Sequence, residues 1–159
     1  MTIKRKVSDP IKYYILVAND TLSSEDDVKI PALQIAKERL LDGRWNLYKA
    51  TRNREAIRAQ DRVLIYLAGK HLHAKHFFAK ATVSEVATPG RAARNNEEIW
   101  EEKPSKILVL KDVELIGPIH IKDKFSQLSF IPNHNKWGVV LMGGCRNISR
   151  EDYEAVLRT

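Results

Sequence analysis

Residues 128–144 read LSFIPNHNKWGVVLMGG, and a polar segment at 133–136 separates the two apolar halves of this stretch. Pro132 and Asn133 are residue types that turn a chain. The apolar run at 137–142 predicts the last strand of a sheet. Trp137 stands at the junction, where it either supports the fold or contacts a ligand, and the sequence leaves both roles open.

Four segments before this stretch are rich in β-branched and aromatic residues, which predicts strands; they are residues 12–18, 62–68, 76–86 and 106–116. A short basic turn joins the second and third, so they predict a hairpin. A helix is predicted at 31–42, where Pro31 suits the first turn and Gly43 follows the last residue. Ser149 predicts the N-cap of a C-terminal helix. These elements indicate a curved, mainly antiparallel sheet, with a barrel as one possible form.

The chain of 159 residues is long enough for one domain, which we assign to 11–159, after a flexible basic tail at 1–10. Its 27 basic and 20 acidic residues give a net charge of +7, which suits a polyanion such as nucleic acid. The alternative is that the charge only serves solubility. Cys145 is the single cysteine, which fits a reducing cytoplasm, and no run is apolar enough to predict a membrane span.

Catalytic and metal sites find little support in the sequence. Cys145 has no recognisable nucleophile motif around it, and we expect a small buried residue there. His71, His73 and His76 make a zinc pair conceivable, but they lie in a turn rich in lysine. We therefore expect no catalytic residues, no metal and no cofactor, so that the chain is a binding protein and not an enzyme. A metal-dependent nuclease is the weakest of the readings left open.

Aromatic residues among basic ones are the more informative pattern. Trp45 follows Arg44, and further arginines and lysines occur over the next dozen residues. Proteins that bind an extruded base stack it on aromatic side chains and bond its polar edge, while cations bind the phosphates. Trp45 has an equally good alternative role as a core residue.

Four blocks of sequence together resemble the EVE domain, a member of the PUA-like superfamily and a relative of the YTH domain. They are YYILVAN at 13–19, GRW at 43–45, DRVLIY at 61–66, and residues 128–137 together with ISREDY at 148–153. The last block is the most specific because its order and spacing are unusual. Gln60 stands where the family has a glycine, a departure that should only alter a turn.

The resemblance implies an α+β fold that is mainly β: a PUA-like curved mixed β-barrel of five to six strands with flanking helices. It also implies a reader of modified nucleobases, such as N6-methyladenine or 5-methylcytosine, in an aromatic pocket. Matched to the family, Trp45 is the first wall of that pocket and Asn19 reads the base edge. Trp100 supplies a second wall, and Phe130 and Trp137 line or support the pocket.

Five cations near these positions are expected to hold the flanking phosphates: Arg44, Lys49, Arg52, Arg54 and Lys70. The expected partner is RNA or DNA that carries a modified base, with no membrane and with a possible partner protein from a modification or restriction system. The alternative is a PUA-like module that binds structured RNA without any modified base.

Overall fold

The computed structural model of the chain describes residues 10–22, 28–89, 104–131 and 137–158. The predicted tail at 1–10 therefore lies outside the described residues except for Pro10, as does most of the loop at 87–104. In these ranges no helix has the length and apolar character that a bilayer crossing needs.

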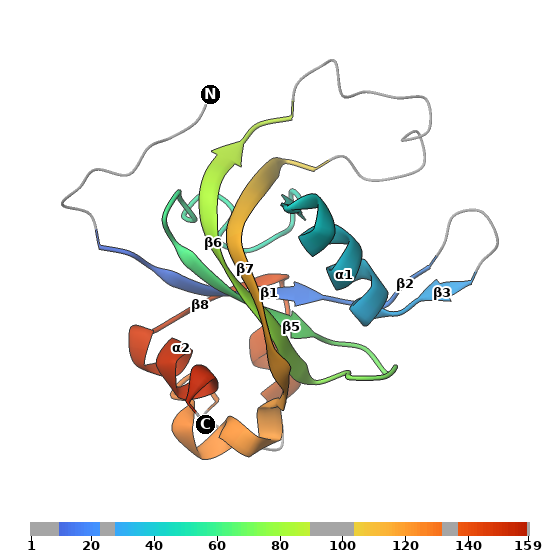
Figure 1. The fold of residues 1–159 in the computed structure, drawn as a ribbon, viewed down its shortest axis with the longest axis vertical. Coiled ribbons are helices and arrows are strands. Elements are labelled where there is room, and N and C mark those ends of the chain that lie inside the picture. Colours follow the sequence, from blue (N-terminus) through green and yellow to red (C-terminus); the bar gives the residue numbers. More distant parts are fainter. Residues whose placement is uncertain (1–9, 23–27, 90–103, 132–136, 159) are drawn as a thin grey trace.

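A curled, mixed sheet of six strands forms a half-barrel at the centre of the protein (Figure 1). In spatial order the strands are β4 (Arg44–Leu47), β7 (Lys106–His120), β6 (His76–Ala87), β5 (Arg62–Leu67), β1 (Tyr13–Ala18) and β8 (Cys145–Ile148). β1 and β5 run parallel with Val17 opposite Tyr66, and the other neighbouring strands are antiparallel. The mainly-β fold class and the β5–β6 hairpin are confirmed.

Two strands of the sheet differ from the sequence-based prediction. The segment at 137–142 is not the last strand, because Trp137–Leu141 forms the 3-10 helix η4. Gly143 and Gly144 follow it with positive φ angles of 99° and 81°, and the last strand, β8, begins only at Cys145. The periodicity of a short apolar run does not show whether the run forms a strand or a helix. β4 was not predicted, because four residues are too few for an alternation of apolar and polar side chains to be recognised.

The first helix, α1 (Ala32–Asp42), follows a small ribbon of β2 (Thr21–Leu22) and β3 (Lys29–Ile30). Pro31 is its N-cap, and Gly43 ends it with a φ of 69° in the left-handed region. The Gly43 N–H donates to the Leu40 carbonyl oxygen at 3.2 Å, which satisfies one of the carbonyls at the helix end. The predicted helix is confirmed to within one residue.

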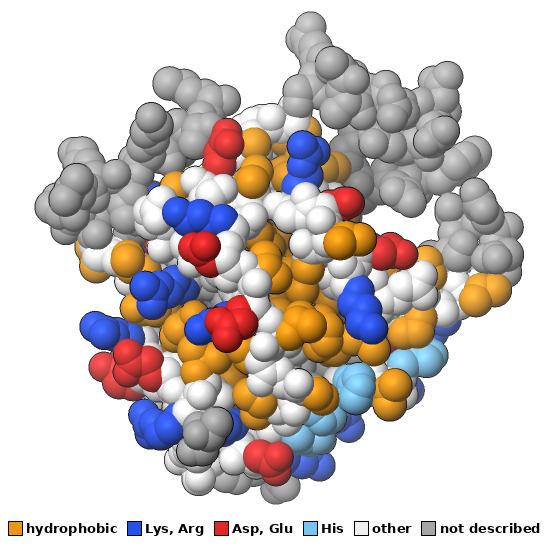
Figure 2. Space-filling view, in the orientation of Figure 1, with side chains coloured by type: hydrophobic (Ala, Val, Ile, Leu, Met, Phe, Trp, Pro, Cys, Tyr) orange, Lys and Arg blue, Asp and Glu red, His pale blue; other side chains and the backbone are white. Residues whose placement is uncertain are grey.

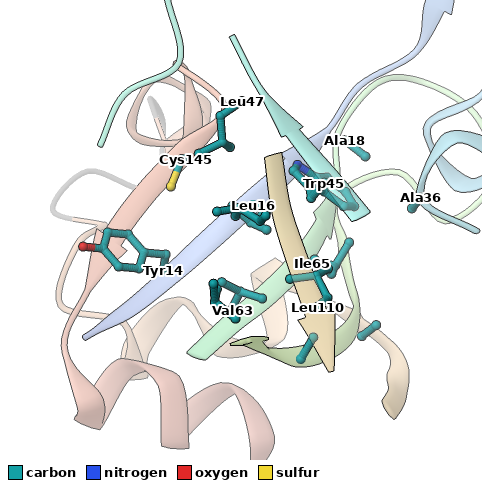
Figure 3. Packing of buried hydrophobic residues seen from close by; sticks show 14 of the residues in the cluster. Tyr14, Leu16, Ala18, Ala36, Trp45, Leu47, Val63, Ile65, Leu110 and Cys145 are labelled. Carbon is teal, nitrogen blue, oxygen red and sulfur yellow. The ribbon is translucent and has the colours of Figure 1, made fainter. Parts of the chain in front are cut away.

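The sheet separates two apolar cores, because successive residues of a strand face opposite sides. Tyr14, Leu16 and Ala18 of β1 belong to the core beneath α1, which we call the α1-side core (Figure 3). Ile15 belongs to the opposite core, together with Tyr66 of β5; we call this the α2-side core. It is covered by η3 (Ile121–Gln127), η4 and α2 (Arg150–Leu157).

A buried carboxylate connects the two halves of the most specific sequence block. Asp152 is 3% exposed, and its two carboxylate oxygens accept bonds from the Ser129 N–H at 2.8 Å and the Ser129 Oγ–H at 2.6 Å. Its own N–H donates to Ser149 Oγ at 3.1 Å, which confirms the predicted cap of α2. The block is therefore one hydrogen-bonded unit that holds residues 128–131 against α2.

The half-barrel is closed by a loop. β4 and β8 are the two edge strands of the sheet. The loop after β4 reaches across to the segment before β8: the Arg52 N–H donates to the Gly143 carbonyl at 2.9 Å, and Asn53 Nδ2 donates to the Cys145 carbonyl at 2.9 Å. This contact fixes the glycine pair at 143–144 against the rest of the fold.

Candidate functional site

A cavity of about 420 Å³ opens where the two parallel strands, β1 and β5, end. Its walls come from the ends of these strands, from the turn between β5 and β6, from η4 and from the glycine pair. Binding sites for small molecules commonly enclose roughly 300–1,000 Å³. The cavity is therefore large enough to hold a single small ring system.

Strand alternation decides which side chains reach this cavity. Val17 and Asn19 lie two residues apart, so they share one face, and Tyr66 and Ala68 do the same at the end of β5. The parallel register sets Val17 opposite Tyr66, which brings the two pairs together. All four side chains lie on the face of the α2-side core.

Two polar groups of the cavity wall have unused hydrogen-bonding capacity. Asn19 Oδ1 accepts a bond from the Asp20 N–H at 3.2 Å, and its amide Nδ2 has no partner in the described part of the chain. The Tyr66 hydroxyl likewise bonds to none of the described residues, although the residue is 2% exposed. Burial raises the pKa of Tyr66 well above its usual value of 10, so the hydroxyl keeps its proton. Both groups can donate a hydrogen bond to a ligand.

Trp137 supplies an aromatic surface to the cavity. It is the first residue of η4, is half-buried, and lies in the cavity wall with Leu141 and Met142. Phe125 of η3 packs against it, with ring centroids 5.6 Å apart and planes inclined by 57°. This contact supports the indole from the protein side, so Trp137 both supports the fold and lines the cavity. The two roles that the sequence left open coexist.

Asp20 fixes the turn that contains Gly69 of the cavity wall. Its side chain is 4% exposed and accepts bonds from the N–H groups of Ala32 at 2.9 Å and Lys70 at 3.0 Å, while His71 Nδ1 lies 3.0 Å away. Burial disfavours its charge, but these bonds outweigh burial and keep the pKa of Asp20 below its usual value. Gly69, with a φ of +92°, passes so close that an added Cβ would lie 2.4 Å from the Asp20 carboxylate.

Arg52 lies across the glycine pair on the opposite wall. A Cβ added to Gly143 would come within 2.6 Å of Arg52 Cδ, so the arginine stem covers this glycine. The Arg52 N–H is bonded to Gly143, as described above, and the side chain is exposed. A cation is thereby fixed at the rim of the cavity.

The predicted phosphate-binding residues divide into two groups. Lys70 follows Gly69 of the wall, and with Arg52 it lies at the cavity. Arg44 lies on the edge strand β4 and Lys49 in the turn after it, and Arg54 is within 3.7 Å of Glu55 Oε1. None of these last three contributes to the cavity wall. Their role in holding phosphates stays a prediction.

Trp45 requires a correction, because the structure does not bring it to the cavity. Its side chain is 2% exposed in the α1-side core, where Figure 3 shows it among the other residues of the cluster, beside Ala18 and above Ile65. The Arg39 guanidinium lies over its ring at 4.9 Å. A ring covered in this way has no free face for a base. The physical reason is that Trp45 and Asn19 belong to opposite faces of the sheet.

The other two aromatic predictions have different outcomes. Phe130 is 7% exposed and packs in the α2-side core with the Arg146 guanidinium 5.8 Å from its ring, so it supports the fold and does not line the cavity. Trp100 lies outside the described residues.

Tyr66 and Lys75 are polar residues of the wall that were not among the predicted site residues. Tyr66 was recognised only as part of a strand motif, and Lys75 only as part of a basic turn. The register of two parallel strands would have identified Tyr66, because it places that residue beside Val17 and near Asn19. The turn brings Lys75 to the wall. Lys75 has a φ of 67°, in the left-handed region, and a lysine in the sequence does not predict this conformation.

Cys145, the nucleophile candidate, is a buried core residue. Cys145 is 1% exposed, and burial, with a smaller contribution from Asp61, raises the pKa of its thiol to about 12. In the described ranges, no three or more His, Cys, Asp or Glu side chains are grouped so as to hold a metal ion.

Comparison with known proteins gives a family model and several solved structures. The family model described as EVE domain matches residues 13–159. Human THYN1, solved with DNA containing 5-methylcytosine, superimposes with a TM-score of 0.59 at 12% identity, over 92% of this chain and 95% of that one. The YTH domain of Zygosaccharomyces rouxii MRB1, solved with N6-methyladenosine RNA, gives 0.54 at 14% identity, over 99% and 93%.

A third structure, Atu2648 from Agrobacterium tumefaciens, gives a TM-score of 0.53 at 14% identity, over 92% of this chain and 91% of that one. No curated protein matched the sequence. At these identities the likeness establishes the fold, which is the PUA-like half-barrel with flanking helices.

Proposed function

The chain belongs to the EVE domain family, and from this premise we propose that it is a nucleic-acid reader whose cavity at the ends of β1 and β5 takes one modified base. The observation that carries the proposal is the combination of a supported indole, two unused hydrogen-bond donors and a cationic rim around one cavity. The solved relatives with methylated DNA and methylated RNA support the choice of ligand class.

Stacking on Trp137 is the main attraction in this proposal. Stacking of a base on an aromatic side chain is worth about 1–3 kcal/mol. Phe125 keeps the indole in place, so little side-chain entropy is lost when a base binds. The role first given to Trp45 therefore passes to Trp137.

Asn19 and Tyr66 provide recognition of the base edge. The free Nδ2 of Asn19 and the hydroxyl of Tyr66 each offer a donor to a ring nitrogen or carbonyl oxygen. A methyl group on the base would lie against Val17, Leu141 or Met142, the apolar part of the wall. Each Å² of apolar surface buried contributes about 25 cal/mol, so discrimination also depends on the shape of the cavity.

Arg52, Lys70 and Lys75 would bind the flanking phosphates. Lys75 lies in the cavity wall, and the other two flank it. Because such contacts release counterions, affinity should fall steeply with salt for modified and plain strands alike.

The test is a titration of matched single strands that differ in one base: plain, 5-methylcytosine and N6-methyladenine, each as DNA and as RNA. We expect one modified strand to bind more tightly than its plain counterpart. Trp137→Ala should abolish this preference, and Trp137→Phe should retain part of it, since a smaller ring still stacks. Fluorescence anisotropy at constant salt measures both.

Two outcomes decide against the proposal. If Trp137→Ala weakens binding to plain and modified strands equally, the cavity does not read the modification. If the wild-type protein prefers structured RNA and shows no preference for any modified base, the chain is a PUA-like RNA-binding module that recognises shape.

A further inference from the structure

Three histidines from separate parts of the chain gather beside the cavity. His73 lies in the β5–β6 turn, His76 begins β6, and His120 ends β7 opposite His76. The ring centroids of His73 and His76 are 5.9 Å apart, and those of His76 and His120 are 4.6 Å apart. Figure 2 shows the histidines at one edge of the molecule, next to lysines. We call these three residues the histidine strip.

The strip adjoins the proposed base site directly, because Lys75 of the cavity wall is the residue before His76. The turn that joins them is fixed at both ends: the Lys75 N–H donates to the Leu67 carbonyl at 2.6 Å, and the Ile121 N–H donates to the Lys75 carbonyl at 2.9 Å. A ligand held in the cavity would therefore have the strip at a fixed position beside it.

Backbone hydrogen bonds determine the tautomers of two of these rings. His76 Nδ1 lies 2.7 Å from the Ala74 carbonyl oxygen, which can only accept, so this nitrogen carries a proton. His120 Nδ1 accepts a bond from the Lys122 N–H at 3.1 Å, so this nitrogen carries none. Neutral His120 consequently has its proton on Nε2, whereas neutral His76 has a lone pair there.

The two Nε2 atoms remain available to a ligand. Neither has a partner among the described residues, and neither is enclosed by the protein. His120 thus presents an N–H donor while neutral, and His76 becomes a donor and a cation when it takes a proton. Protonating His120 instead would break its bond to Lys122. Burial is the largest cause that lowers the pKa of His120. The positive charges of His76, Lys122 and Lys75 lower it further, and the negative charge of Asp123 opposes them.

The charges around the strip favour an anion. The turn contributes Lys75 and η3 contributes Lys122, while Asp123 is the carboxylate on that helix. An ammonium N–H of Lys124 donates to the Arg158 carbonyl oxygen, and His71 Nδ1 lies 3.0 Å from Asp20 Oδ2, so these two cationic side chains already have partners. Phosphate oxygens accept hydrogen bonds only, which matches the N–H donors of Lys75, Lys122 and His120, and that of His76 once it is protonated.

We propose that the histidine strip, with Lys75 and Lys122, is a second binding surface that takes the phosphodiester backbone next to the bound base, and that protonation of His76 strengthens it. The proposal rests on the proposed function of the cavity, but it concerns a different part of the ligand. We therefore expect the strip to make affinity depend on pH and salt to the same extent for modified and plain strands.

The test measures affinity for a modified and a plain strand of equal length at pH 6 and pH 8, over a series of salt concentrations. Each phosphate contact on a single strand contributes about −0.7 to the slope of log affinity against log salt. The wild-type slope should become steeper by about 0.7 at pH 6. Affinity at fixed salt should rise roughly two- to fivefold, the range of an exposed ion pair.

His76→Gln keeps a polar side chain that cannot be protonated, and it should remove both pH effects while leaving the ratio of modified to plain affinity unchanged. Lys111→Gln is the matched control: it removes one exposed positive charge from a distant part of β7 and should leave the pH effects intact. A thermal melt of each variant verifies folding. His120→Gln removes the imidazole ring that accepts the Lys122 N–H bond and presents the Nε2 donor, so it should weaken binding at both pH values.

The outcomes separate the two proposals. Affinity that is independent of pH in the wild type, or pH effects that survive in His76→Gln, overturns the role of the strip. Equal affinity for modified and plain strands with the pH effects intact overturns the base site and leaves the strip standing. Failure to bind any strand overturns both.

Discussion

Trp45 and Trp137, the tryptophans in the described part of the chain, lie on opposite sides of the central sheet and have opposite surroundings. Trp45 is 2% exposed among the aliphatic side chains of the α1-side core, whereas Trp137 is half-buried beside polar groups and cations. In the sequence, Trp45 stands among several cations, whereas Trp137 follows the polar segment at 133–136. The comparison shows that basic and aromatic composition can suggest a binding site, whereas the side of the sheet on which an aromatic residue lies decides whether its ring can contact a ligand.

The largest expected effect comes from removing the buried tryptophan. Trp45→Ala should lower the free energy of unfolding by about 3–5 kcal/mol, because it leaves a cavity in a close-packed core. Trp137→Ala should cost less, since its side chain already contacts solvent. Urea unfolding of both variants measures this. A larger loss for Trp137 than for Trp45 would reverse the assignment of the two faces.

The second effect concerns the wall of the cavity. Gly69→Ala should lower the free energy of unfolding by about 1–3 kcal/mol, because it combines a strained positive φ with an approach of 2.4 Å to Asp20. Gly138→Ala is the matched control in the same cavity, since an added Cβ there meets nothing within 4 Å. If the two variants are equally stable, the turn moves freely and Asp20 does not fix it.

Asp20 itself should produce a smaller effect that depends on pH. Its folded pKa lies below the unfolded value, so its charged form stabilises the protein above the usual carboxyl range, and this contribution disappears as pH falls through the folded pKa. Asp20→Asn should therefore destabilise at pH 7, on the order of 1 kcal/mol, and the difference from wild type should shrink toward pH 3.

Denaturant midpoints measured from pH 7 to pH 3 provide the comparison for Asp20→Asn. Glu38→Gln, which removes an exposed carboxylate on α1, serves as the control and should change little at any pH. A loss in Asp20→Asn that stays constant over the whole range would show that its charge does not matter.

The smallest effect is expected at Cys145, in the α1-side core. With its pKa raised to about 12 by burial, the thiol should not react with iodoacetamide at pH 8 in the folded protein, and should react once urea unfolds it. Mass spectrometry measures the modified fraction. Fast modification without denaturant would mean that this core opens readily.

Much of the fold could be predicted from the sequence because its central elements are long and regular. The alternating pattern at 76–86 identified β6, and Ser149 and Gly43 marked helix ends through their local chemistry. β4 and β8 could not be recognised, because strands of four residues depend on partners far away in the chain. Their pairing is a property of the folded protein alone.

The candidate site was harder to predict for the same reason. Asn19 and Trp137, two of the residues predicted to bind a base, line the cavity, and the predicted phosphate ligands Arg52 and Lys70 adjoin its glycines; their binding roles stay predictions. Trp45 was misplaced because its strand was not recognised, so the face to which it points was unknown. The contact that makes Tyr66 part of the wall is a parallel pairing between residues 17 and 66, and no local pattern reports it.

The pairing of β8 with β1 also bears on the synthesis of this protein. Residues 13–16 pair with β5 on one side, but their partners on the other side are residues 145–148, and the cavity wall is incomplete before Gly144. At about 5–20 residues per second, β1 is made on the order of ten seconds before β8. A nascent chain thus carries its basic segments and Asn19 for that time without a formed pocket. The segment that completes the cavity wall is thus translated long after Asn19, the residue that it joins there.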